Sequence, residues 1–97
     1  MEKSGEKLHR VEITVHGRVQ GVAFRFYTQS QARQLGVTGW VRNNADGTVR
    51  ILAEGTRAEL ETFLAWTGRG PDHARVDRQD THWSEASGRF QEFNITG

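Results

Sequence analysis

Residues 17–25 read Gly-Arg-Val-Gln-Gly-Val-Ala-Phe-Arg, a glycine-punctuated segment that ends in an arginine. It lies within the stretch from Ile13 to Ala45, which holds no Asp or Glu although the whole chain carries twelve acidic residues. Glycine-containing loops that lead into a helix bind anions through backbone N–H groups, and positive surroundings favour the same ligand. The pattern therefore predicts a phosphate-binding loop. Its expected donors are the backbone amides of Arg18, Val19, Gln20, Gly21, Val22 and Ala23.

Arg25 is the first candidate side chain of this site. It falls in the first turn of a predicted helix, where the macrodipole disfavours a cation by about 0.3–1 kcal/mol. A bound dianion reverses that effect and matches the planar guanidinium. The alternative is a solvated helix residue, but the adjoining loop and the acid-free stretch favour an anion-binding role for Arg25.

Asn43 is the second candidate. It continues the alternation of Val37, Gly39 and Val41 and lies where that predicted strand ends. Asparagine before a turn commonly bonds the local backbone, which is the alternative role. An amide can orient water but cannot take its proton, and the stretch holds no carboxylate to do so. Such a site suits a leaving group that departs unprotonated, such as a carboxylate, in a phosphoryl transfer that mainly needs positioning and charge stabilisation.

The composition excludes several other chemistries. The chain has no cysteine, which removes a cysteine nucleophile, thiolate metal sites and disulfides. The loop lacks the Gly-Lys-Ser/Thr ending of a nucleotide-binding P-loop. A net charge of +1 gives no global field toward nucleic acid or a membrane. We expect no metal, because a metal site needs clustered ligands and the histidines are scattered along the sequence, at His9, His16, His73 and His82. No cofactor is expected either.

The length of 97 residues suits one small domain. The polar segment 1–7 is expected to be a flexible tail without a secretory signal, and 8–97 a single domain. No apolar run approaches the roughly 18–20 residues of a membrane span, so a cytoplasmic location is expected. Alternating apolar residues and turn signals predict strands at 11–16, 37–43 and 48–54, with weaker strands at 74–82 and 90–96. Helical spacing predicts helices at 24–35 and between the capping box Thr56–Glu59 and residues 68–71.

This order predicts a ferredoxin-like α/β (α+β) sandwich, βαββαβ with a short extra C-terminal strand. Its mostly antiparallel sheet would be covered by two helices on one face. The first two strands would run parallel with the third between them, so their C-terminal ends share one edge of the sheet. The glycine loop and Asn43 would therefore converge on the helix-covered side of that edge.

At these residues the chain resembles the acylphosphatase family. The resemblance rests on Gly-Arg-Val-Gln-Gly-Val-x-Phe-Arg at 17–25 and Gly-Trp-Val-Arg-Asn at 39–43, followed by Asp46-Gly47-x-Val49. It continues through Gly55, Phe63, Gly70-Pro71 and Ala74-x-Val76 to Phe93-x-Ile95.

The resemblance implies hydrolysis of small acyl phosphates to a carboxylate and inorganic phosphate, without a metal or covalent intermediate. Arg25 and the loop amides would hold the phosphoryl group, and Asn43 would orient the attacking water. Inorganic phosphate or sulfate would compete, and a monomer is expected. Ala23 departs from the glycine that many microbial members carry at a variable position, so we expect only a slightly stiffer loop.

Two other classes of function remain open at this stage. RNA-recognition domains share the strand and helix order, but they use aromatic residues on central strands, and the third strand here offers Arg50, Ile51 and Leu52. A phosphate-binding or regulatory domain without turnover is the other class, because acylphosphatase-like modules occur within larger carbamoyl-transfer maturation enzymes. No zinc-finger cysteines appear in this sequence, which favours a stand-alone enzyme.

Overall fold

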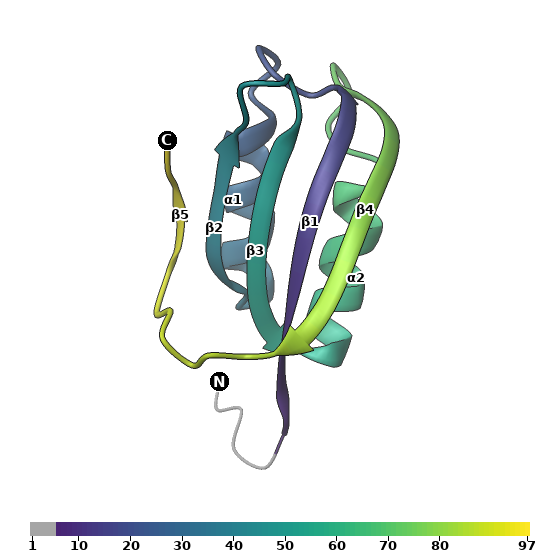
Figure 1. The fold of residues 1–97 in the computed structure, drawn as a ribbon. Coiled ribbons are helices and arrows are strands. Elements are labelled where there is room, and N and C mark those ends of the chain that lie inside the picture. Colours follow the sequence, from purple (N-terminus) through teal and green to yellow (C-terminus); the bar gives the residue numbers. More distant parts are fainter. Residues whose placement is uncertain (1–5) are drawn as a thin grey trace.

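The computed structural model describes residues 6–97, so most of the predicted tail 1–7 lies outside the described residues. Figure 1 shows one layer of strands with two helices packed against one face. Neither helix, within residues 6–97, is long and apolar enough to cross a membrane. The elements in chain order are β1 (Leu8–Arg18), α1 (Phe24–Leu35), β2 (Thr38–Asn43), β3 (Val49–Thr56), α2 (Arg57–Thr67), β4 (Arg75–Glu85) and β5 (Phe93–Ile95).

The sheet has five strands in the order β4-β1-β3-β2-β5. Strand β3 pairs antiparallel with both β1 and β2, so β1 and β2 run parallel on either side of it. Strand β5 is the extra C-terminal strand, and it pairs in parallel with β2. The ferredoxin-like fold predicted from the sequence is confirmed. As Figure 1 shows, the β1–α1 loop and the β2–β3 turn lie at the same edge of the sheet.

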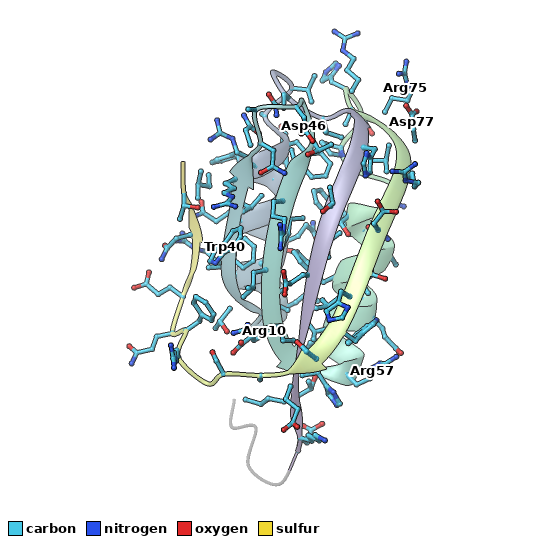
Figure 2. All side chains as sticks on the ribbon, in the orientation of Figure 1. Arg10, Trp40, Asp46, Arg57, Arg75 and Asp77 are labelled. Carbon is cyan, nitrogen blue, oxygen red and sulfur yellow. The ribbon has the colours of Figure 1, made fainter. Side chains whose placement is uncertain are left out.

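The hydrophobic core lies between the sheet and the helices. On β1 the alternating residues Val11, Ile13 and Val15 are fully buried, as the period of two predicts. Phe24 from α1 and Phe63 from α2 fill the space above them. The opposite face carries polar side chains and Trp40, which lies on the side of β2 away from the helices (Figure 2).

The two helices begin differently. Helix α2 has the predicted capping box: the Thr56 hydroxyl oxygen accepts from the Glu59 N–H at 3.2 Å, and the Glu59 carboxylate accepts from the Thr56 N–H at 3.0 Å. Helix α1 begins after Ala23 with no side-chain cap and no acidic residue in its first turn. Its first N–H groups therefore have neither an intrahelical partner nor a capping side chain.

Strand β1 runs further than the sequence suggested. Gly17 and Arg18, expected in the loop, pair with Val76 and Arg75 of β4 after a register shift at His16/Gly17. A Cβ on Gly17 would lie 2.1 Å from the Arg75 carbonyl oxygen, so only glycine fits. The glycine that looked like part of the loop instead lets β4 approach closely, and the loop itself begins at Val19.

Candidate active site

A cleft of about 180 Å³ opens at this sheet edge and contains both predicted side chains. Arg25 enters it from the first turn of α1, and Asn43 enters it from the last residue of β2. These residues are far apart in sequence and meet because β1 and β2 are parallel and end at the same edge. The lining is completed by Val19, Gly21, Ala23, Phe24, Phe26 and Ile95.

The loop backbone alternates between left-handed and ordinary conformations. Gly21 has φ 76° and Ala23 has φ 59°, while Val22 between them has a negative φ. Alternation of left-handed and ordinary residues turns successive N–H groups toward one point. The uncapped N-terminus of α1 adds its own N–H groups and the positive end of its dipole. Of the six amide donors predicted from sequence, those of Val19, Gly21 and Ala23 belong to residues that line the cleft, whereas Arg18, Gln20 and Val22 do not line it.

Ala23 has a backbone conformation that was not predicted from the sequence. It is the N-cap of α1 in the left-handed conformation, with φ 59° and ψ 24°, and no other non-glycine residue of 6–97 has a positive φ. A Cβ in this conformation costs roughly 1–2 kcal/mol. The alanine therefore stores local strain at the point where the loop enters the helix.

Arg25 is the arginine available to the cleft. Its side chain is half-buried and makes no ion pair within residues 6–97. Two other arginines of the acid-free stretch are occupied elsewhere: Arg33 donates to the Phe93 carbonyl at 3.3 Å, and Arg42 stacks on the Trp40 ring with its guanidinium carbon 4.9 Å from the ring centre. The positive charge counted in the sequence is thus only partly directed at the cleft.

Asn43 presents an unusual group to the cleft. Its amide oxygen Oδ1 is buried and has no hydrogen-bond partner within the described residues. Buried polar atoms are nearly always paired, and leaving one unpaired costs about 1–3 kcal/mol. The next residue, Asn44, does make a side-chain hydrogen bond within the turn, because its Nδ2 donates to the Thr48 hydroxyl at 2.9 Å. The Asn43 Oδ1 itself makes no bond to the local backbone within the described residues, which was the alternative role considered for this residue.

Gln20 ties the loop to the β2–β3 turn. Its side-chain Nε2 donates to the Asn44 carbonyl at 2.8 Å and to the Thr48 carbonyl at 2.9 Å. The turn is itself fixed, because the Asp46 carboxylate accepts from the Thr48 N–H at 3.0 Å and from its hydroxyl at 2.6 Å. Sequence reasoning counted Gln20 only as a backbone donor, since no residue pattern reveals where a loop glutamine points.

The nearby ionisable groups are held by other partners. Hydrogen bonds from the side chain and then the backbone of Thr48 lower the pKa of Asp46, which lies at the turn labelled in Figure 2. A hydrogen bond from His16 lowers the pKa of Asp80, with Nε2 and Oδ2 2.9 Å apart. Neither carboxylate lines the cleft, and none of its lining residues within 6–97 is a His, Cys, Asp or Glu. Residues 6–97 also contain no group of three or more such side chains arranged to hold a metal ion.

Comparison with known proteins gives a consistent result. The family model described as Acylphosphatase matches residues 11–95. An acylphosphatase of Salinibacter ruber is 47% identical over 95 residues, which cover 98% of this chain and 98% of that protein.

Solved structures agree with the sequence comparison. The crystal structure of acylphosphatase from Bacillus subtilis superposes with a TM-score of 0.89 at 35% identity, covering 92% of this chain and 99% of that one. A crystal structure of full-length HypF in the phosphate- and nucleotide-bound form also matches, with a TM-score of 0.88 at 26% identity. The match covers 99% of this chain but only 13% of HypF.

Proposed function

Because the chain belongs to the acylphosphatase family, we propose that it hydrolyses small acyl phosphates by direct attack of a water molecule on the phosphoryl group. The products would be a carboxylate and inorganic phosphate. The observation that carries the proposal is the buried, unpartnered amide oxygen of Asn43 in the same cleft as Arg25.

Binding of the phosphoryl group would fall to Arg25 and the backbone. The guanidinium can donate two parallel hydrogen bonds to phosphoryl oxygens, and it makes no competing ion pair within residues 6–97. The loop N–H groups and the uncapped end of α1 would stabilise the remaining negative charge. These donors are fixed before substrate arrives, so they can stabilise the transition state without reorganisation.

The chemical step would use Asn43 to orient the water. Its Oδ1 accepts a hydrogen bond from one O–H and directs the water lone pair toward phosphorus. The new P–O bond forms as the bond to the acyl oxygen breaks, and that electron pair leaves on the carboxylate. A carboxylate of low pKa departs without protonation, so the lack of a general acid among the cleft residues fits this leaving group. The proton of the attacking water passes to solvent or to a phosphate oxygen.

The test compares Asn43→Ala with Arg25→Ala on benzoyl phosphate. Asn43→Ala should lower kcat by about 100-fold or more, while the inhibition constant of inorganic phosphate stays unchanged, because the phosphate-binding groups remain. Arg25→Ala should weaken inhibition by phosphate and lower kcat/KM strongly. Arg42→Ala is the matched arginine control, because its guanidinium stacks on Trp40 on the opposite face of the sheet, and it should alter neither value.

Two results separate this proposal from its rivals. Near-normal turnover in Asn43→Ala would contradict the water-orienting role. If phosphate raises the melting temperature but no acyl phosphate is hydrolysed, the chain is a phosphate-binding module like the alternative considered from sequence.

A further inference from the structure

Beside the polar groups, the cleft has an apolar wall formed by Phe26 and Ile95. Phe26 is 61% exposed and Ile95 is 38% exposed, and both line the cleft with Arg25 and Asn43. Single exposed apolar residues are normal on protein surfaces. Here, however, two of the three large exposed hydrophobic residues within 6–97 adjoin the same small cleft, and the third is Tyr27. Their shared position needs a reason beyond chance exposure.

The wall is held by the fold. Phe26 follows Arg25 directly in the first turn of α1. Ile95 lies on β5 and pairs in register with Val41 of β2. Val41 is two residues before Asn43 on the same strand. Strand β5 is fixed on its other side by α1, because Gln29 Nε2 donates to the Phe93 carbonyl at 3.1 Å. The backbone positions of Phe26 and Ile95 are therefore fixed relative to the polar end of the cleft.

The polar and apolar parts of the cleft match the two halves of an acyl phosphate. The phosphoryl half needs charge and N–H donors, whereas a hydrocarbon acyl half such as benzoyl carries no charge and is favoured by an apolar surface. A dry cavity of about 150 Å³ accommodates a benzene molecule, so a cleft of about 180 Å³ has room for a phosphoryl group with only part of a ring inside. An exposed aromatic ring at the rim can cover the remainder by edge or offset stacking.

We infer that Phe26 and Ile95 form an acyl-group subsite, which makes the protein select aromatic or branched acyl phosphates over acetyl phosphate. This inference rests on the proposed function. The subsite contributes to substrate preference and takes no part in binding inorganic phosphate, because phosphate has no acyl half to contact the wall.

The experiment measures kcat/KM for benzoyl phosphate and for acetyl phosphate in the whole chain and its variants. Phe26→Ser and Ile95→Thr remove the apolar surface at exposed positions, and Phe26→Leu retains it. In both polar variants the ratio of kcat/KM for benzoyl phosphate to kcat/KM for acetyl phosphate should fall by about 5-fold or more. The expected change is smaller than for a fully enclosed pocket, because the two side chains are partly exposed. Phe26→Leu should keep most of the ratio. The inhibition constant of phosphate should be unchanged in all three variants.

The intrinsic reactivity of the two substrates cancels when variant ratios are compared with the parent ratio. An unchanged ratio in both polar variants, with phosphate inhibition intact, would overturn the acyl subsite while leaving the proposed function in place. Absence of hydrolysis of both substrates by the parent chain would instead overturn the proposed function. If one polar variant differs from the parent in melting temperature or circular dichroism, the conclusion is drawn from the other polar variant. This is possible because Phe26 and Ile95 lie on different elements, so a folding defect at one does not affect the test at the other.

Discussion

Replacing Gln20 by Met tests how the phosphate loop is held in place. The substitution keeps an unbranched side chain of similar length but removes both hydrogen bonds from Nε2 to the Asn44 and Thr48 carbonyls. Neither carbonyl becomes unpaired, because Asn44 O still accepts from the Gly47 N–H at 3.3 Å and Thr48 O from the Asn44 N–H at 2.9 Å. Two neutral hydrogen bonds without an orphaned partner are worth about 1–2 kcal/mol of unfolding free energy.

For a chain of this size, that loss lowers the melting temperature by about 4 °C or more. The functional effect should be larger than the loss of stability suggests. Without the side-chain bridge, the loop N–H groups and the start of α1 lose their fixed distance to Asn43. A misplacement of about 1 Å can cost roughly 100-fold in rate, so we expect kcat/KM on benzoyl phosphate to fall by about 10- to 100-fold. Phosphate should also inhibit more weakly, because the same amides bind it.

Gln79 provides a matched control. It too bonds a backbone carbonyl, donating from Nε2 to Leu64 O at 3.1 Å, and it accepts from the Thr67 hydroxyl at 2.9 Å. Gln79→Met should therefore lower the melting temperature by a similar amount, while kcat/KM and phosphate inhibition stay at parent values. If Gln20→Met and Gln79→Met reduced stability equally and neither changed phosphate inhibition, the positioning role of Gln20 would be refuted.

Two further predictions concern strain and pH. Ala23→Gly should raise the melting temperature by about 2–6 °C, because the strain energy released at the left-handed position exceeds the cost of the added entropy of the unfolded chain. Ala23→Val should lower the melting temperature. A glycine variant less stable than the parent would contradict the presence of strain at this position. Burial raises the pKa of Glu54, but hydrogen bonds from the Ser87 N–H, Arg10 and the Gly88 N–H lower it overall below its ordinary 4.5. This carboxylate therefore stabilises the fold above about pH 4.5, and the contribution is lost as the pH falls through its lower folded-state pKa. Glu54→Gln should cost about 2–4 kcal/mol of unfolding free energy at neutral pH. It should also weaken the loss of stability that urea unfolding shows as the pH falls below about 4.5, and an unchanged pH dependence would count against the assignment.

The sequence predicted the fold well because its signals are local and repeated. The alternation of Val11, Ile13 and Val15 reports a buried face directly, and the Thr56–Glu59 capping box forms as its residue types require. The edge that brings Arg25 and Asn43 together follows from strand order alone, without any side-chain geometry. These inferences required only the alternation of apolar residues and the positions of the turns.

The parts that sequence reasoning missed depend on contacts between distant segments. Counting arginines could not reveal that Arg33 bonds β5 or that Arg42 stacks on the far face. Gly17 reads as a loop residue until β4 is seen to lie against it. The bridging role of Gln20 could not be read from the sequence either, because its two hydrogen-bond acceptors lie in a turn more than twenty positions away.

The proposed role of Ile95 in specificity also depends on a contact between distant segments. As the last residue of a weak C-terminal strand, it carries no sequence signal of a binding role. It reaches the cleft only because β5 pairs in parallel with β2, beside the strand that ends in Asn43. The groups proposed for the chemistry lie in short motifs, whereas the proposed acyl subsite combines a motif-adjacent residue with one supplied by long-range pairing. Substitutions at Phe26 or Ile95 could therefore change which acyl group is accepted while the phosphate loop, Arg25 and Asn43 stay as they are.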